Sequence, residues 1–138
     1  MPAGELTKQD FAYIFSQYYL YSRNFTRYLA AVMASCDNDR LRNRLAQNLW
    51  EESGIDQSRT HAEIFRTFLT CSLGIHNLEA IQYTSSAQFF AQEYQRNAAC
   101  PDPVWSSAWL SSVRKELSLG CTKFLLKGCV KQAFLTQN

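Results

Sequence analysis

The chain has 138 residues, of which 46% are hydrophobic and 19% charged, and its formal charge at pH 7 is +2. This length suits one domain with a hydrophobic core, and the composition excludes an intrinsically disordered chain. The small charge argues against nucleic acid as a partner, and no apolar run approaches the roughly 20 residues that cross a membrane.

The start of the chain carries neither the basic segment nor the apolar segment of a secretory signal, so we expect a cytoplasmic protein. Its five cysteines include no Cys-x-x-Cys pair, which disfavours a zinc ribbon or a redox dithiol. We therefore interpret the cysteines as small, buried, reduced side chains.

Apolar spacing predicts helices through the first hundred residues. None of the three prolines falls between Thr7 and Cys100. Thr7 with Asp10 three residues later resembles a capping box, and the first helix is predicted to run from Thr7 to about Ser35.

Asp37 is the predicted cap of a second helix that ends at Gly54. Its inner face is predicted to carry Leu41, Leu45, Asn48, Leu49 and Glu52. Ser58 is the predicted cap of a third helix that ends at Gly74. Its inner stripe is predicted to carry His61, Ile64, Phe65, Phe68 and Leu69.

A fourth helix is predicted from the Thr84–Ser85 cap toward Cys100, with Phe89 and Tyr94 facing inward. Pro103 suits the first turn of a fifth helix. That helix would carry Val104, Trp105, Ala108 and Trp109. The fold class is therefore predicted to be all-α, a helical bundle in a single domain over residues 1–138.

Two polar residues lie on otherwise apolar stripes. Glu52 ends the second stripe and His61 begins the third, and an antiparallel hairpin through Gly54 would bring both to one end of the core. A carboxylate and an imidazole buried together must pair or bind a metal. The spacing therefore leaves two interpretations open: a metal site built as in di-iron bundles, or a salt bridge at a solvent-facing helix end.

The neighbouring polar residues receive simpler interpretations. Glu51 and His76 are expected in solvent, and Asn48 either supports the pair by a hydrogen bond or has no such role. Arg40, Arg42 and Arg44 are expected to form a solvated helix face. No phosphate-binding loop or nucleophile elbow occurs in the sequence.

Five short segments resemble one family, the haem-oxygenase-like di-metal oxidases, in the region of their first core helices. The segments are Gly4 to Lys8, Gln17 to Tyr21, Asn24 to Ala31, Asn48 to Gly54 and Thr60 to Phe65. This superfamily includes the PQQ-synthesis protein C group, thiaminase-II-like proteins and the chlamydial death-domain-associating protein. The resemblance covers about residues 4–110 and implies the N-terminal part of a haem-oxygenase-like bundle.

By position, Glu52 resembles the carboxylate ligand of a core helix in this family, and His61 the histidine that follows it. The resemblance implies iron or another first-row metal as cofactor. It also implies an iron-dependent oxidoreductase or oxygenase that acts on a small aromatic or cofactor-precursor molecule.

The sequence departs from the family in its ligand set. Relatives carry an acidic ligand on the first core helix, whereas this chain has Gln17-Tyr18 there and Asp10 as the only acid of that helix. The ligands of the second half of the family bundle are also missing. We therefore expect an activity impaired by truncation.

Residues 111–138 do not resemble the family and are expected to be an atypical tail. Reverse translation of this tail, shifted by two nucleotides, can yield a family-like continuation, which suggests a frameshift near Ser112. Cys121 and Cys129 would then reflect the reading frame rather than redox chemistry.

Two other functions remain open. A truncated, non-catalytic chain would leave inner helix faces uncovered and form a homo-oligomer through them. The uncovered side chains would include Phe65, Phe68, Trp105 and Trp109. A protein-interaction module is suggested only by the death-domain-associating relative.

Overall fold

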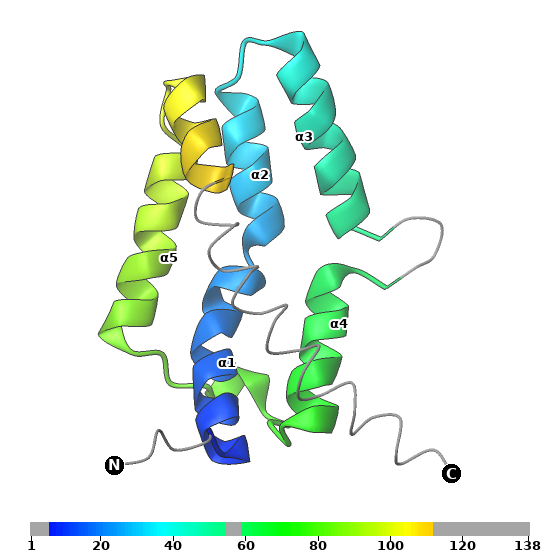
Figure 1. Ribbon diagram of the computed structural model, residues 1–138, viewed down its shortest axis with the longest axis vertical. Coiled ribbons are helices and arrows are strands. Elements are labelled where there is room, and N and C mark those ends of the chain that lie inside the picture. The colour runs from blue at the N-terminus through cyan, green and yellow to red at the C-terminus, as the bar shows by residue number, and fades with distance from the viewer. Residues whose placement is uncertain (1–5, 55–58, 112–138) are drawn as a thin grey trace.

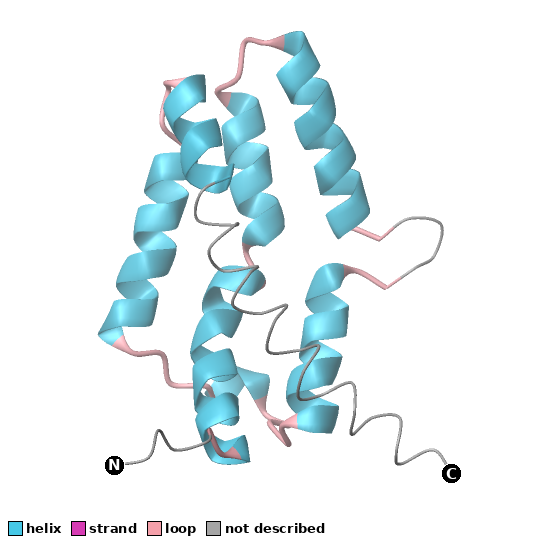
Figure 2. Cartoon of the chain, viewed as in Figure 1, coloured by secondary structure: helices cyan, strands magenta, loops and turns pink. Residues whose placement is uncertain are grey.

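The computed structural model describes residues 6–54 and 59–111, and all the regular structure in these two ranges is helical (Figures 1 and 2). The helices are α1 (Lys8–Ser22), α2 (Phe25–Ala34), α3 (Asp39–Glu52), α4 (His61–Thr67), the π-helix η1 (Phe68–Ser72), the 3₁₀-helix η2 (Leu78–Ala80) and α5 (Ser85–Ala98). Residues 103–111 are also helical. The predicted all-α fold is therefore confirmed, whereas the predicted tail and the frameshift near Ser112 concern residues outside the described ranges.

The helices form three columns. α1 and α2 follow one another along the central column, α3 and α4 return along one side, and α5 lies along the other side (Figure 1). Contacts join α2 to α3 and α5, and join α1 to α4, η1 and α5. Among the described residues, no helix has the length and apolar character needed to cross a membrane.

The central column is broken between α1 and α2, whereas the sequence predicts one continuous helix from Thr7 to about Ser35. The break falls at Arg23 and Asn24, between α1 and α2. The Asn24 side-chain amide donates a hydrogen bond to the Leu20 carbonyl at 2.8 Å. Asparagine competes in this way with the helical ladder, which is why it favours helix ends over helix interiors.

Each of the first, third and fourth helices begins at a residue whose side chain caps it, but two of the three caps differ from the predicted residues. The capping box at Thr7 and Asp10 is present and begins α1 as predicted. The cap of α3 is Asn38 rather than Asp37. The cap of α4 is Thr60, so the prediction of Ser58, which lies outside the described residues, is wrong.

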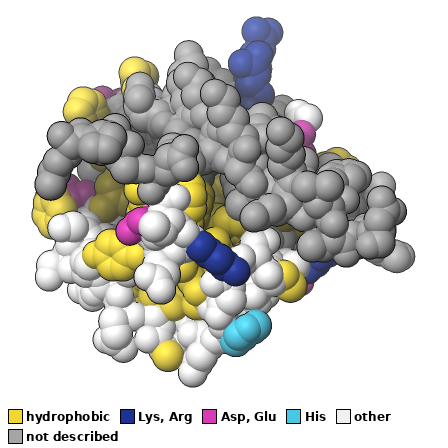
Figure 3. Space-filling model, turned by 60° about the horizontal axis from the view of Figure 1, so that its bottom comes forward, with side chains coloured by type: hydrophobic (Ala, Val, Ile, Leu, Met, Phe, Trp, Pro, Cys, Tyr) yellow, Lys and Arg dark blue, Asp and Glu magenta, His cyan; other side chains and the backbone are white. Residues whose placement is uncertain are grey.

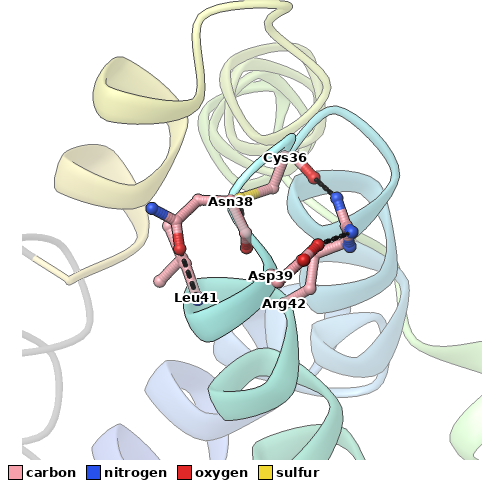
Figure 4. A network of polar contacts seen from close by, with 5 residues as sticks. All are labelled: Cys36, Asn38, Asp39, Leu41 and Arg42. Carbon is pink, nitrogen blue, oxygen red and sulfur yellow. Dashed lines mark hydrogen bonds and ion pairs between the residues drawn. The ribbon is translucent and has the colours of Figure 1, made fainter.

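The turn between α2 and α3 is tied by polar contacts (Figure 4). The Asn38 side chain accepts a hydrogen bond from the Leu41 N–H at 3.0 Å, which satisfies the first turn of α3. Arg42 donates to the Cys36 carbonyl at 2.7 Å and pairs with Asp39. These contacts leave Arg42 half-buried rather than on the fully solvated face that the sequence suggested.

Two hydrophobic cores lie one above the other. The upper core comprises Tyr21, Tyr28, Leu29, Val32, Leu45, Tyr94, Ala98 and Leu110. The lower core comprises Phe15, Tyr19 and Leu69, with Phe11, Phe65, Phe68, Leu73, Ile75, Leu78 and Ile81 packed against it. Tyr18 packs against both cores and so connects the two levels.

Several side chains point elsewhere than predicted. Tyr94 is buried as expected, but Phe89 is 64% exposed and Phe90 packs on the upper core instead. One residue turns a helix by about 100°, so a register error of one position moves a side chain off the core face. Ile64 is 51% exposed although its predicted stripe faces inward.

Apolar surface remains on the described part of the chain, and Figure 3 shows apolar side chains reaching the surface on the face that it presents. Trp105 is largely exposed, as predicted for an uncovered face. Phe65 and Phe68 are half-buried, because they pack into the lower core. Of the described cysteines, Cys36 is buried as expected, whereas Cys71 is exposed.

Three tyrosines pack together in the upper core. The ring centroids of Tyr21 and Tyr28 lie 4.8 and 4.7 Å from that of Tyr94. The Tyr94 hydroxyl donates to the Leu110 carbonyl at 3.3 Å, which joins the last described helix to α5. Burial raises the pKa of Tyr28 to about 12 and raises the pKa of Tyr21 well above its ordinary value of 10, with a contribution from the Tyr94 hydroxyl.

We expect Phe90→Ala to lower the free energy of unfolding by about 2–4 kcal/mol, because it removes ring contacts with Tyr21 and Tyr94. Phe89→Ala is the matched control and should stay within about 0.5 kcal/mol of the parent chain. Urea unfolding followed by circular dichroism measures both values. Equal losses in the two variants would contradict the observed register of α5.

Alkali should unfold the upper core. Because the pKa values of Tyr21 and Tyr28 are raised in the folded state, their stabilising effect is complete below pH 10 and is lost as the pH rises through 12. Tyrosinate absorbance and helical circular dichroism, recorded together against pH, should therefore change in one transition above pH 10. Ionisation of every tyrosine near pH 10 with the helices intact would contradict this burial.

Candidate functional site

Glu52 and His61 meet where α3 ends and α4 begins. The His61 Nδ1 atom lies 2.5 Å from the Glu52 Oε2 atom. The Glu52 side chain is only 10% exposed, whereas the His61 side chain is 65% exposed. The sequence predicts that these two residues come together, and the structure confirms the contact.

The route by which they meet differs from the predicted hairpin. α3 and α4 follow one another in the same direction along one column, so the pair lies at a junction within the column (Figure 1). Gly54 stands just after α3 with φ of 84°, in the left-handed region that glycine adopts without strain.

A capping box fixes the start of α4 at His61. The Glu63 N–H donates to the Thr60 hydroxyl at 3.1 Å, and the Thr60 N–H donates to the Glu63 carboxylate at 2.9 Å. The hydrogen bonds that the Glu63 carboxylate makes with the backbone N–H and the side chain of Thr60 hold the pKa of this carboxyl below its usual value. His61 is the first helical residue and lies between the two residues of the capping box, Thr60 and Glu63.

Aromatic rings hold α4 against α1 one turn after His61. The Phe65 ring centroid lies 5.7 Å from that of Tyr18 and 6.0 Å from that of Tyr19. The Phe68 ring meets Phe15 edge-on at 5.2 Å. The second turn of α4, one turn after His61, is therefore anchored in the lower core.

A buried carboxylate needs compensation, and the imidazole of His61 supplies it. Among residues 6–54 and 59–111, no three His, Cys, Asp or Glu side chains gather into a group that could hold a metal ion. The described chain therefore presents a pair of donors rather than a complete coordination shell. Both interpretations of the pair, a salt bridge and a set of metal ligands, remain compatible with this geometry.

The donor types fit a first-row metal, since carboxylate oxygen and imidazole nitrogen are common ligands of iron and its neighbours. Two ligands of one metal, each about 2.0–2.2 Å from it, stand roughly 2.8 Å or more apart. The observed 2.5 Å is shorter, so the two side chains are in direct contact with each other. The exposed His61 ring has room to move outward, and further ligands would have to come from beyond the described residues.

The other predicted polar residues lie apart from this chemistry. Glu51 is exposed and accepts a hydrogen bond from Gln47 at 3.0 Å, and His76 is exposed. Asn48 is half-buried. The predictions of solvated positions for Glu51 and His76 are thus confirmed.

Gln17 has a structural role that sequence reasoning missed. Its side-chain amide donates to the Gln82 carbonyl at 3.0 Å, and its amide oxygen accepts the Thr84 N–H at 2.8 Å. It therefore fastens the segment that leads into α5 to the side of α1. Local sequence patterns carry no signal for this role, because the two partners are backbone groups 65 and 67 residues away along the chain.

Two surface cavities lie away from the pair. One, of about 360 Å³, lies between α1 and the segment from Ile75 to Gln82. The other, of about 490 Å³, is lined by Arg59, Glu63, Arg66, Thr67, Thr70 and Leu78. Neither Glu52 nor His61 lines these two cavities.

Comparisons with known proteins agree with the resemblance. The chain is 29% identical over 100 residues to the 4-aminobenzoate synthase of Chlamydia pneumoniae, which covers 71% of this chain and 43% of that protein. It is 31% identical over 96 residues to the 4-aminobenzoate synthases of Chlamydia trachomatis serovar D and Chlamydia muridarum, covering 67% of this chain. The matches cover 40% and 39% of those two proteins.

The chain thus matches about two fifths of the length of these curated relatives. No solved structure matches it significantly. The sequence profile of the iron-containing redox enzymes matches residues 12–119, which include both Glu52 and His61. The chain therefore belongs to the family of iron-containing redox enzymes.

Proposed function

We propose that this chain contributes Glu52 and His61 as two ligands of iron, or of another first-row metal, in an oxidoreductase. The observation that carries the proposal is the direct contact between the Glu52 carboxylate and the His61 imidazole at the α3–α4 junction. Membership of the iron-containing redox enzyme family supports the choice of metal.

The burial of the pair supports the proposal further. The Glu52 side chain is only 10% exposed, and burial in a medium of low dielectric strengthens the attraction between its carboxylate and a cation. His61 is exposed, which leaves one side of the pair open to an incoming ion. When bound, iron would supply the redox capacity that none of the side chains at this junction has.

The substrate class is proposed from the relatives. The chlamydial proteins are 4-aminobenzoate synthases, whose named product is a small aromatic amine. We therefore propose a small aromatic molecule, or a cofactor precursor of that kind, as the substrate of the assembled enzyme. The remaining ligands would come from residues beyond those described.

A second candidate is a non-catalytic chain that associates with itself. It is favoured by the observation that Glu52 and His61 already compensate each other without a metal. The exposed apolar side chains Phe89, Val104 and Trp105 supply surface for such association. In this case the pair is a salt bridge that fastens α3 to α4.

Metal binding separates the two candidates. We expect the purified chain to bind Co²⁺, used as a spectroscopic substitute for Fe²⁺, and Glu52→Ala or His61→Ala to weaken binding at least about tenfold. Glu51→Ala and His76→Ala are matched controls, because they remove the same two side-chain types from solvent-exposed positions. Isothermal titration calorimetry and the visible spectrum of bound Co²⁺ give the affinities.

Two results would contradict the metal proposal. One is a parent chain that binds no Co²⁺, and the other is an equal loss in Glu51→Ala and Glu52→Ala. Metal-free protein that forms stable oligomers in size-exclusion chromatography with light scattering, unchanged by either ligand substitution, would support the second candidate.

A further inference from the structure

We infer that Thr60 is a positioning residue for His61, acting through its capping box with Glu63. The inference rests on the proposed role of His61 as a ligand and adds to it the residue that sets the direction of the imidazole. Thr60 and Glu63 are assigned no contact with the metal.

The need for such a residue follows from the length of α4. The α-helix has seven residues, His61–Thr67, and none of them is fully buried. Isolated helices shorter than about 12 residues are marginal in water, so α4 depends on contacts outside its own backbone ladder. The first fully buried side chain of this segment is Leu69, two turns after His61.

Aromatic packing against α1 holds the part of α4 that follows His61. Phe65 contacts Tyr18 and Tyr19 on α1, and Phe68 contacts Phe15. These contacts fix the second turn of the helix, whereas the first turn has the mostly exposed His61 ring at its start. The first turn is therefore ordered by the Glu52–His61 contact and by the groups at its own end.

The capping box supplies that order. The two hydrogen bonds between Thr60 and Glu63 close a ring of backbone and side-chain atoms around His61. They satisfy donors that have no partner within the helix, which is the usual cause of fraying at a first turn. A frayed first turn would let the His61 Nδ1 atom leave the Glu52 carboxylate.

The chain contains its own control for this inference. Thr7 and Asp10 form the same kind of box at the start of α1, with hydrogen bonds of 3.2 and 2.9 Å. That box lies at the start of the central column, away from the α3–α4 junction (Figure 1). Removing it should weaken a helix start in the same way without moving His61.

The test uses the full 138-residue chain and four substitutions. Thr60→Ala removes the cap, Thr60→Ser keeps a hydroxyl that can cap, Glu63→Gln keeps a side chain that can complete the box, and Thr7→Ala removes the control cap. The Co²⁺ affinity should fall about fivefold or more in Thr60→Ala. It should stay within about twofold of the parent value in the other three.

A second measurement needs no metal. In the metal-free protein at fixed pH, the imidazole resonances of His61 in Thr60→Ala should move toward those of Glu52→Gln, and Thr60→Ser should restore them. Circular dichroism checks that each variant is folded, and Glu63→Ala replaces Thr60→Ala if the latter does not fold.

The outcomes separate this inference from the proposed function. If the parent chain binds no Co²⁺, the proposed function fails, and the His61 resonances alone decide whether Thr60 positions the ring. The inference is overturned if Thr60→Ala leaves both the affinity and the resonances unchanged. It is also overturned if Thr7→Ala changes them as much as Thr60→Ala does.

Discussion

The contact between Glu52 and His61 is the interaction on which the side column depends. α3 and α4 are separate helices, and this contact joins the buried end of one to the exposed start of the other. Without it, the buried Glu52 carboxylate would lose the compensation that the imidazole gives it. The same two atoms thus serve the fold, and they are the atoms that a metal would have to separate.

The central column connects the two hydrophobic cores. It is interrupted at Asn24, and Tyr18, which lies six residues earlier in α1, packs against both cores. The upper core joins α2, α3 and α5, and the lower core joins α1 to the α4–η1 segment. His61 begins the helix that packs on the lower core through Phe65, so its placement depends on the packing of α4 more than on that of α5.

Sequence reasoning could locate the helices because apolar periodicity and capping residues are local signals. Thr7 with Asp10 marked the start of α1, and Tyr94 was correctly placed in the core. Apolar spacing continues across the break at Asn24 and therefore does not reveal it. Phe89 and Phe90 are adjacent aromatic residues, and apolar spacing alone does not decide which of them faces the core. The Glu52–His61 contact followed from two polar residues on apolar stripes. The sequence does not show that α3 and α4 run in the same direction, because the eight residues between Glu52 and His61 are long enough either to reverse the chain or to continue it.

The hydrogen bonds of Gln17 limit which side chains could replace it. An amide both donates and accepts, and here it does so toward the Gln82 carbonyl and the Thr84 N–H. A carboxylate in its place could still accept from Thr84 but would set an anion against the carbonyl oxygen of Gln82. An acidic residue at this position would therefore loosen the entry to α5. The course of the chain into α5 thus depends on one side chain that can both donate and accept a hydrogen bond.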